Sequence, residues 1–486
     1  MGELNEMRIC IIAEGSYPYV TGGVSSWIHS LITNMPEHEF VIFCIGAQSR
    51  QQGQFKYTLP PNVVQVQEIF LDAYLEETGE SGHRYRMNAE QKAALLSLLS
   101  GDLRTDWPGI FDLLRSSKFR SAADFLMSKD YFDVLVELAQ DKYAQIPFTE
   151  LFWTVRSMIL PLFLALRHDI PEADVYHSVS TGYAGMIGSL AKHLYGRPFL
   201  LTEHGIYSRE REEEIIKSDW VKGYFKDLWI EYFYQLSGCT YAHADEVITL
   251  FTRNKEIEIE LGCDPEKIRI IPNGVSIEDY AEIARTEPAE DGRLRIGAIV
   301  RVVPIKDIKT MIQAFALVKR ELSQAELYIM GPQEEDEEYY HECLQLVDSL
   351  GVTDVIFTGE VQIKTYLGRM DLLLLSSISE GMPLAVLEGM ASARACITTD
   401  VGSCRELLLA DDGFGPAGAV VPVMHYDLLA SAMVRLGRSR SLRETMGRNA
   451  LNRAGTLYTR EQFIHGYRDL YASYEEVRAW PASALN

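Results

Sequence analysis

Two glutamates form the sharpest chemical pattern in the chain, within the segment Ser376-Ser-Ile-Ser-Glu380-Gly-Met-Pro-Leu-Ala-Val-Leu-Glu388. Glu380 falls in a loop between an apolar run and a helical stretch, and Pro383 suits the first turn of that helix. Glu388 lies further along the helix among apolar residues, so its carboxylate requires a hydrogen-bonding partner, and ribose hydroxyls are suitable donors. The alternative is that both carboxylates satisfy backbone N–H groups at a helix start.

A pair of basic residues, Arg301 and Lys306, stands where another predicted strand ends and a helix starts. Cations at such a position can stabilise the negative charge of a departing nucleoside diphosphate, above all where water is excluded. The alternative is that both side chains are ordinary solvated surface. The chain has 46 Lys and Arg against 69 Asp and Glu, a net charge of −23, which argues against a nucleic-acid-binding protein. Any anionic ligand must then be held by a few local cations and backbone N–H groups.

A glycine pair near the N-terminus, Gly22 and Gly23 in Tyr17-Pro-Tyr-Val-Thr-Gly-Gly-Val24, precedes a predicted helix. Paired glycines let the backbone approach a ligand, and the start of the helix offers free N–H groups to an anion. The segment matches neither the dinucleotide-binding G-x-G-x-x-G pattern nor a Walker loop. A plain tight turn is the alternative.

These residues belong to a chain in which short apolar runs alternate with amphipathic stretches. A first series runs from about residue 8 to 271, with a long helix expected at 219–243, and a second runs from about 294 to 409. The first is interrupted at about 71–167 by a Leu-, Ala- and charge-rich stretch of helical periodicity. Such alternation predicts an α/β fold with two doubly wound parallel-sheet domains, and we expect them to face each other across a cleft.

The domain boundary is predicted at the turn signal Pro272-Asn-Gly274, which an acidic, turn-rich stretch follows. We expect a first domain over residues 1–273, with the helical insertion at about 71–167, and a second over 274–460. Residues 461–486 are expected to form a C-terminal helix that crosses back to the first domain.

Composition and cysteine usage narrow the class of protein. The seven cysteines are odd in number and scattered without a C-x-x-C pair, so we interpret them as reduced and mostly buried. The N-terminal segment carries acids where a signal peptide carries basic residues, and the longest apolar run, near 158–166, is short of the ~20 residues that cross a bilayer. The sequence therefore predicts a cytoplasmic protein, and any membrane association would come through partners.

Taken together, these motifs resemble a known family. Arg301 and Lys306, followed by Glu380 and Glu388 in a Glu-Gly-Met-Pro-Leu context, are similar to the signature of retaining GT-B glycosyltransferases with nucleotide-sugar donors, family four. The segment from Glu14 to Trp27, the helical insertion and Thr202-Glu-His-Gly-Ile-Tyr-Ser-Arg-Glu-Arg211 resemble the cytoplasmic glycosyltransferases of bacterial Pel exopolysaccharide synthesis. The resemblance makes the first domain the acceptor side and the second the nucleotide-sugar-binding domain.

The resemblance also implies roles for individual residues. Arg301 and Lys306 would neutralise the donor diphosphate, Glu388 would hold the ribose, and Glu380 would contact the transferred hexose. His204 matches a family histidine near the sugar, although a lone histidine is more often a satisfied core residue. The base would lie near 359–361. The remaining donor contacts implied are Gly22, Gly23, Val361, Gly381, Met382, Pro383 and Leu384.

The reaction that follows is transfer of a hexose from a UDP-sugar to a growing exopolysaccharide, with inner-membrane synthase subunits as partners. Retention of configuration comes from the resemblance alone. Because the chain contains no Asp-x-Asp, we expect no metal and no other cofactor. Two alternatives stay open: a catalytically silent nucleotide-binding subunit, and another GT-B enzyme such as a phosphorylase or an epimerase.

Overall fold

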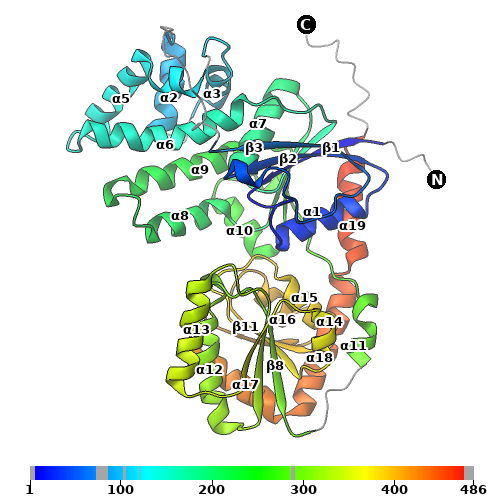
Figure 1. The fold of residues 1–486 in the computed structure, drawn as a ribbon. Coiled ribbons are helices and arrows are strands. Elements are labelled where there is room, and N and C mark those ends of the chain that lie inside the picture. Colours follow the sequence, from blue (N-terminus) through cyan, green and yellow to red (C-terminus); the bar gives the residue numbers. More distant parts are fainter. Residues whose placement is uncertain (1–5, 73–85, 102–104, 120, 286–290, 476–486) are drawn as a thin grey trace. The chain divides into compact units, whose positions relative to one another are not determined.

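A computed structural model describes residues 6–72, 86–101, 105–119, 121–285 and 291–475, and these form two compact units (Figure 1). Unit 1 comprises Met1–Thr249, Lys255–Arg269 and Arg468–Asn486, and unit 2 comprises Leu250–Asn254 and Ile270–Tyr467. The last helix, α19 (Arg460–Ala472), thus begins in unit 2 and ends in unit 1.

Unit 1 is built on a seven-stranded sheet of order β3-β2-β1-β4-β5-β6-β7. The pairings from β3 through to β6 are all parallel. Five consecutive residues of β1 are buried, because helices cover both faces of a parallel sheet and its strands read as unbroken apolar runs. The strands are β1 (Arg8–Glu14), β2 (Glu39–Gly46), β3 (Val63–Phe70), β4 (Val175–Ser178), β5 (Phe199–Glu203), β6 (Glu246–Thr249) and β7 (Ile268–Ile270).

Helices α2 to α6 follow β3 and precede β4, where the sequence predicts a helical insertion. Helix α7 packs on β1, β4 and β5, and it also contacts α6 and α9. The helices of the first part of the chain are α1 (Gly23–Thr33), α2 (Ala89–Leu99), α3 (Trp107–Leu114), α4 (Ala122–Leu126), α5 (Lys129–Lys142), α6 (Phe148–Arg167), α7 (Tyr183–Tyr195), α8 (Tyr207–Lys217), α9 (Lys226–His243) and α10 (Thr252–Glu260).

The prediction of one helix over 219–243 is wrong at its start. A 3₁₀ turn, Gly223–Phe225, precedes α9, which begins at Lys226. Glycine is a poor helix former, and the Lys226 ammonium donates hydrogen bonds to the carbonyls of Ile216 (2.6 Å) and Ser218 (3.0 Å) at the end of α8. The chain therefore turns before the helix begins.

Unit 2 holds a six-stranded, wholly parallel sheet of order β10-β9-β8-β11-β12-β13. Figure 1 shows α12 and α13 on one side of this sheet and α15 and α18 on the other. The two parallel sheets confirm the predicted fold class. The strands are β8 (Leu294–Ile299), β9 (Ala325–Met330), β10 (Val355–Gly359), β11 (Leu372–Leu375), β12 (Ala395–Thr399) and β13 (Gly418–Val421). The helices are α11 (Ala281–Arg285), α12 (Ile308–Glu321), α13 (Glu337–Leu350), α14 (Ile363–Leu367), α15 (Leu384–Ala391), α16 (Cys404–Leu409), α17 (Tyr426–Arg438) and α18 (Arg440–Leu457).

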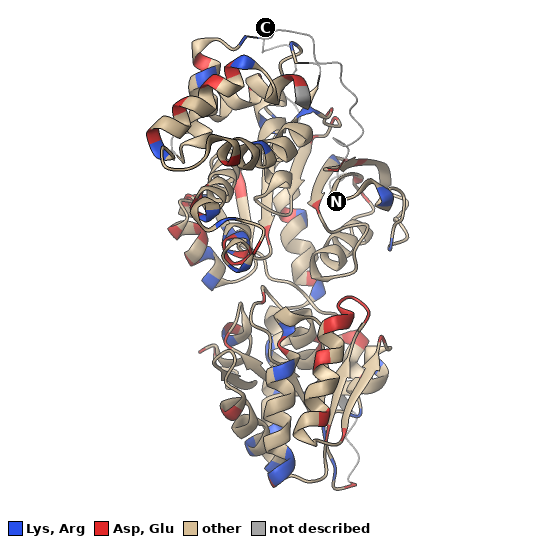
Figure 2. Cartoon of the chain, turned by 60° about the vertical axis from the view of Figure 1, so that its left-hand side comes forward, with Lys and Arg blue, Asp and Glu red and all other residues tan. Residues whose placement is uncertain are grey.

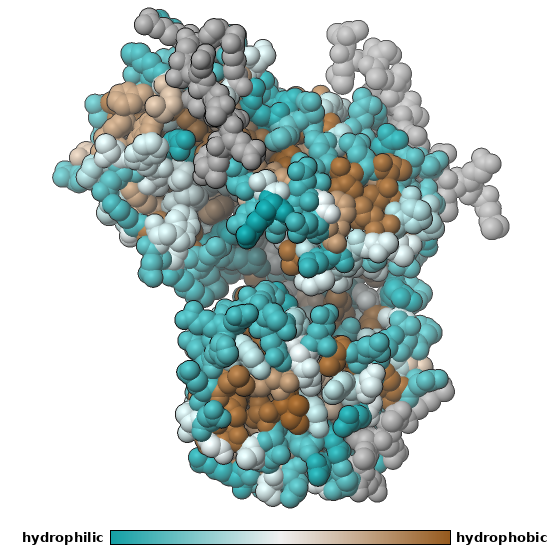
Figure 3. Space-filling model, viewed as in Figure 1, coloured by the Kyte–Doolittle hydropathy of each residue, from teal (hydrophilic) through white to brown (hydrophobic). Residues whose placement is uncertain are grey.

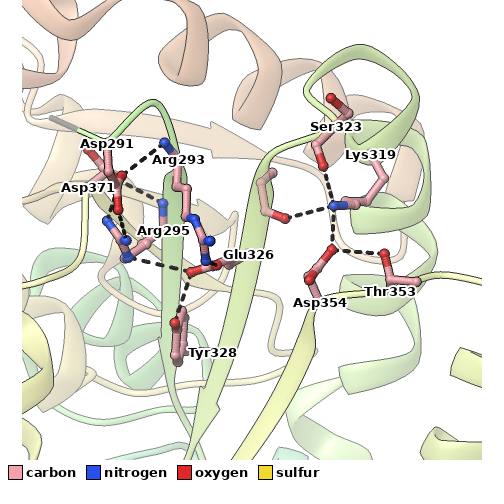
Figure 4. A network of polar contacts seen from close by, with 11 residues as sticks. Asp291, Arg293, Arg295, Lys319, Ser323, Glu326, Tyr328, Thr353, Asp354 and Asp371 are labelled. Atoms are coloured by element: carbon pink, nitrogen blue, oxygen red, sulfur yellow. Dashed lines mark hydrogen bonds and ion pairs between the residues drawn. The ribbon is translucent and has the colours of Figure 1, made fainter. Parts of the chain in front are cut away.

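Charged side chains join neighbouring strands at the amino edge of the unit 2 sheet, as Figure 4 shows. Arg293 pairs with Glu326 at 2.5 Å, and Glu326 also accepts a hydrogen bond of 2.9 Å from Tyr328. Lys319 binds Asp354 at 2.7 Å and the carbonyl of Ala325 at 3.1 Å. The charges at this edge are therefore engaged in holding strands together.

Charged and hydrophilic residues are spread over both units, as expected for a chain with 24% charged residues. In Figure 2 basic and acidic residues are interspersed along the helices, strands and loops of both units, and Figure 3 shows hydrophilic residues over most of the visible face of each unit. Helix α6 has the length and mean hydropathy (1.3) of a membrane span. It contacts α3, α4, α5 and α7, and 56% of its apolar window is buried among them, as in a core helix.

Candidate functional site

The site of unit 2 lies at the carboxyl edge of its sheet, where the strand order reverses. Strands β8 and β11 are neighbours, although two strands separate them in the sequence. The loops that leave two such strands run to opposite faces of a sheet and leave a crevice in which ligands bind. Arg301 and Lys306 follow β8, and Glu380 follows β11. The order of the strands thus brings together residues that are more than seventy positions apart.

Lys306 and Glu380 form an ion pair at this edge, with 2.5 Å between Nζ and Oε1. Their side chains are only 17% and 12% exposed. The Ser377 hydroxyl donates a second hydrogen bond of 2.5 Å to the same carboxylate oxygen. The described partners of Glu380 therefore all meet Oε1, and the pair places a cation and an anion side by side with little water around them.

Arg301 makes a different kind of contact. Its guanidinium pairs with Glu335, and the two side chains are 38% and 47% exposed. Exposed ion pairs contribute little free energy because water and salt screen them. A phosphate could therefore replace the Glu335 carboxylate on Arg301 at small cost.

Glu388 lies on α15 and is largely buried. Burial raises the pKa of its carboxyl above the ordinary value, while a hydrogen bond from the Tyr280 hydroxyl and the charge of Lys364 oppose this shift. The Lys364 ammonium lies 5.2 Å from the centre of the Tyr280 ring. The Tyr280 hydroxyl thus favours the charged form of the carboxyl, as a ribose hydroxyl would.

The loop from Gly381 to Leu384 is held by hydrogen bonds to its carbonyls from the start of α16 and from the segment before α11. Ser403 N–H donates to the Gly381 carbonyl at 2.9 Å, and the Asn273 amide donates to the Met382 carbonyl at 3.2 Å. Gly402 has a φ of +50°, and a Cβ there would lie 2.1 Å from the Gly381 oxygen, so only glycine fits.

The prediction that Pro383 lies in the first turn of the helix is wrong by one residue. Helix α15 begins at Leu384, and Pro383 is its N-cap, with φ −72° and ψ 116°. This extended conformation lets the Pro383 carbonyl accept from the N–H of Val386 at 3.1 Å. Pro383 therefore starts the helix from outside it.

Val361 follows β10 at the same edge of the sheet. It is partly buried against the core of unit 2. Gly359, two residues earlier, has a φ of +68° and turns the chain at the strand end. The structure thus places the predicted base-binding segment at the carboxyl edge with Arg301, Lys306 and Glu380.

Unit 1 carries the other predicted residues. His204 follows β5, and its ring packs edge-on against Trp27 of α1, with 4.8 Å between ring centres. Burial lowers the pKa of His204 to about 4, so the imidazole is neutral at pH 7. Its Nε2 atom is buried and has no hydrogen-bond partner within the described part of the chain. A neutral ring with an unused polar atom is suited to a sugar hydroxyl.

Gly22 and Gly23 stand at the start of α1. Gly22 has an extended φ of 172°, and a Cβ at either position would meet no atom within 4 Å. Neither the backbone conformation nor packing inside the protein requires a glycine here. The open space leaves both the tight turn and the anion-binding interpretation available.

Three polar residues of the unit 2 site escape the sequence patterns: Tyr280, Ser376 and Ser377. Tyr280 lies more than a hundred positions before Glu388, and no spacing rule connects them. The two serines could have been noticed, because they directly follow the apolar run that becomes β11.

Comparison with known proteins decides the family. A family model described as "Domain of unknown function (DUF3492)" matches residues 7–266, which is more than half of the chain. The chain belongs to the DUF3492 family. A second model, "Glycosyl transferases group 1", matches residues 293–439, and this segment holds Arg301, Lys306, Glu380 and Glu388. The DUF3492 segment coincides with much of unit 1, and unit 2 contains the group 1 glycosyltransferase domain.

Curated relatives and solved structures agree with this assignment. The UDP-Gal:alpha-D-GlcNAc-diphosphoundecaprenol alpha-1,3-galactosyltransferase of Escherichia coli is 27% identical over 328 residues, 64% of this chain and 78% of that protein. The MMP alpha-(1->4)-mannosyltransferase of Mycolicibacterium hassiacum is 24% identical over 393 residues, 78% and 85% of the two chains. Anabaena HepE in complex with UDP and glucose superposes with a TM-score of 0.60 at 15% identity, covering 96% of this chain and 100% of that one. Sucrose-phosphate synthase from Thermosynechococcus elongatus gives the same values. The DUF3492 chain is a glycosyltransferase with the GT-B fold.

Proposed function

We propose that this protein is a retaining hexosyltransferase that uses a UDP-sugar and extends an exopolysaccharide of the Pel type. The observation that carries the proposal is the Lys306–Glu380 pair at the reversal of strand order in unit 2. Support for the donor comes from the galactosyltransferase relative, whose name specifies UDP-Gal, and from HepE, which was solved with UDP and glucose. The Pel-type acceptor rests on the sequence resemblance alone.

The chemistry follows from how charge develops when a nucleoside diphosphate leaves an anomeric carbon. The sugar becomes positive and the β-phosphate gains negative charge. Lys306 and Arg301 would stabilise the leaving phosphate, and the carboxylate of Glu380 would lie near the positive sugar. Glu388 would accept hydrogen bonds from the ribose, and neutral His204 would bind a sugar hydroxyl. The leaving phosphate itself would take the proton of the acceptor hydroxyl as it attacks on the same face.

Metal independence is part of the proposal. The fixed charges of Arg301 and Lys306 would do what a divalent cation does in transferases that carry Asp-x-Asp, a pattern this sequence lacks. Transfer should then continue in excess EDTA. Complete loss that Mg²⁺ or Mn²⁺ restores would contradict this part.

We place the protein in the cytoplasm, recruited to the inner membrane by subunits of a polysaccharide synthase. Helix α6 supports recruitment over insertion, because its apolar residues are largely used in packing within unit 1. Fractionation of cells with and without the synthase subunits would test this: without them, the protein should move from the membrane fraction to the soluble one.

The deciding experiment compares two lysines of the same loop and helix. Lys306→Ala should weaken UDP binding at least tenfold (~1.4 kcal/mol) and abolish transfer from a panel of labelled UDP-hexoses. Lys309→Ala is the matched control, because Lys309 pairs with Glu342 at 2.7 Å on the surface, 40% exposed. Equal UDP affinity in both variants would remove the diphosphate from this site. Tight UDP binding without transfer from any donor would instead indicate a silent nucleotide-binding subunit.

A further inference from the structure

We infer that Ser376 and Ser377 are positioning residues of the donor site, one for Lys306 and the other for Glu380. Both serines directly follow β11, and both are fully buried. The Ser376 hydroxyl bonds the neighbouring loop that carries Lys306, and the Ser377 hydroxyl bonds the side chain of Glu380, three residues further along its own loop. The inference rests on the proposed function, because it assigns these serines to the same donor site.

Ser376 holds the backbone of the loop that carries Lys306. Its hydroxyl lies 2.9 Å from the Lys306 carbonyl and 3.0 Å from the Asp307 carbonyl, and its single proton is shared between them. Asp307 adopts the left-handed conformation, with φ 48° and ψ 52°, and caps α12 through the N–H of Thr310. A non-glycine residue in this conformation is strained, so the turn needs outside support. Ser376 provides it directly beside Lys306.

A backbone bond beside Ser376 ties the same two loops together. The N–H of Ile378 donates to the carbonyl of Ile305 at 2.9 Å. The loops after β8 and β11 are therefore joined on both sides of Lys306. Loss of the Ser376 hydroxyl would leave the Lys306 and Asp307 carbonyls short of a donor and free the lysine backbone to shift.

Ser377 acts on the side chain of Glu380. Its hydroxyl donates to Glu380 Oε1 at 2.5 Å, the oxygen that also meets the Lys306 ammonium. Its own carbonyl accepts a hydrogen bond of 2.6 Å from the Thr399 hydroxyl at the end of β12. Ser377 is thus anchored to a third strand, β12. Together with Lys306 it fixes Oε1 of Glu380, and so it also fixes the orientation of the whole carboxylate.

A purely structural role would look different. Ser392, for comparison, returns its hydroxyl to the Glu388 carbonyl one turn earlier on its own helix, at 2.7 Å. That bond satisfies a buried hydroxyl locally and connects nothing else. Ser376 instead reaches a residue seventy positions away, and Ser377 reaches a carboxylate in an ion pair.

The two serines should therefore give different defects when replaced. Ser376→Ala should weaken UDP binding about tenfold, because the Lys306 backbone loses its support. Ser377→Ala should lower kcat about tenfold while UDP affinity stays within about twofold, because only the carboxylate loses a donor. Ser379→Ala, in the same loop and partly exposed, is the matched control and should change neither value.

Double variants test whether each serine acts through its proposed partner. In a Glu380→Gln background, Ser377→Ala should lower kcat less than twofold further, and in a Lys306→Ala background, Ser376→Ala should weaken UDP binding less than twofold further. Full additivity, or equal losses of melting temperature without the split between affinity and kcat, would overturn the inference. If Lys306→Ala itself leaves UDP affinity unchanged, the proposed donor site fails, and the inference fails with it. A Lys306→Ala defect without the serine effects refutes the inference alone.

Discussion

Replacement of Glu380 by glutamine should strengthen the binding of free UDP while it weakens catalysis. In the structure the Glu380 carboxylate forms an ion pair with the Lys306 ammonium at 2.5 Å, and the two side chains are only 12% and 17% exposed. A diphosphate must compete with that carboxylate for the same cation. The amide oxygen of glutamine still accepts a hydrogen bond from Lys306, but it carries no charge.

The size of the effect follows from the difference between the two contacts. With glutamine at this position the hydrogen bond keeps one charged partner, Lys306, and lies at the low end of the about 1.5–3 kcal/mol that charged hydrogen bonds contribute, whereas the ion pair lies at the high end. The exchange therefore releases about 1 kcal/mol of competition, and UDP should bind about fivefold tighter. Turnover should fall about 100-fold, because the positive charge on the sugar loses its carboxylate.

Calorimetric titration with UDP and a transfer assay with labelled donor measure the two effects on one preparation. Glu342→Gln is the control: it removes the same charge from the exposed Lys309 pair, and neither value should change. Tenfold weaker UDP binding in Glu380→Gln, with the melting temperature retained, would refute the reasoning. It would mean that Glu380 helps to bind UDP instead of competing with it.

Three further predictions concern buried charges. Burial raises the pKa of Glu388, so its carboxylate should be lost, and wild-type UDP affinity should weaken, as pH falls through that pKa. Glu388→Gln should bind UDP more weakly than wild type and without this pH dependence. Calorimetric titrations from pH 5 to 8 measure both. Burial raises the pKa of Glu258 as well, so unfolding releases a proton above about pH 4.5 and stability falls as pH rises. From pH 5 to pH 8 the melting temperature of wild type should therefore fall by about 3 °C or more relative to that of Glu258→Gln. The same dependence of melting temperature on pH in both proteins would contradict this. Arg453, fully buried, binds Asp412 at 2.6 Å, and Arg453→Met should cost about 3–5 kcal/mol in denaturant unfolding; a loss below ~1 kcal/mol would show that Asp412 finds another partner.

The sequence was sufficient to predict the layers of the fold, because the signal for a parallel sheet is local. An apolar run such as β1 is readable wherever helices cover both faces of a sheet. The strand-to-helix junctions at Arg301 and Glu380 were also readable, since each follows such a run. The first residues of helices were predicted less accurately than the strands. A 3₁₀ turn at Gly223 and the N-cap position of Pro383 move the observed helix starts by several residues and by one residue.

The contacts within the site could not be predicted, because they depend on strand order. Nothing in the spacing of Lys306 and Glu380 says that β8 and β11 are neighbours. The same holds for the effect of Tyr280 on the pKa of Glu388, which relates the start of unit 2 to α15. The resemblance named the charged residues, but the hydrogen bonds from Ser376 and Ser377 to two of them depend on how the loops are placed.

The two edges of the unit 2 sheet use charge in opposite ways. At the amino edge, Lys319 binds several groups, and Arg293 pairs with Glu326, which Arg295 and Tyr328 also bind, so an incoming anion would have to break a connected network (Figure 4). At the carboxyl edge, within the described part of the chain, Arg301 pairs with the exposed Glu335 and Lys306 with the Glu380 carboxylate, which a ligand could displace. The net charge of −23 repels a diphosphate at long range, but ionic screening limits that repulsion to about 8 Å at physiological salt. On the proposed function, the two cations in direct contact would then decide the affinity, and an acidic chain could still hold a doubly charged ligand at this edge.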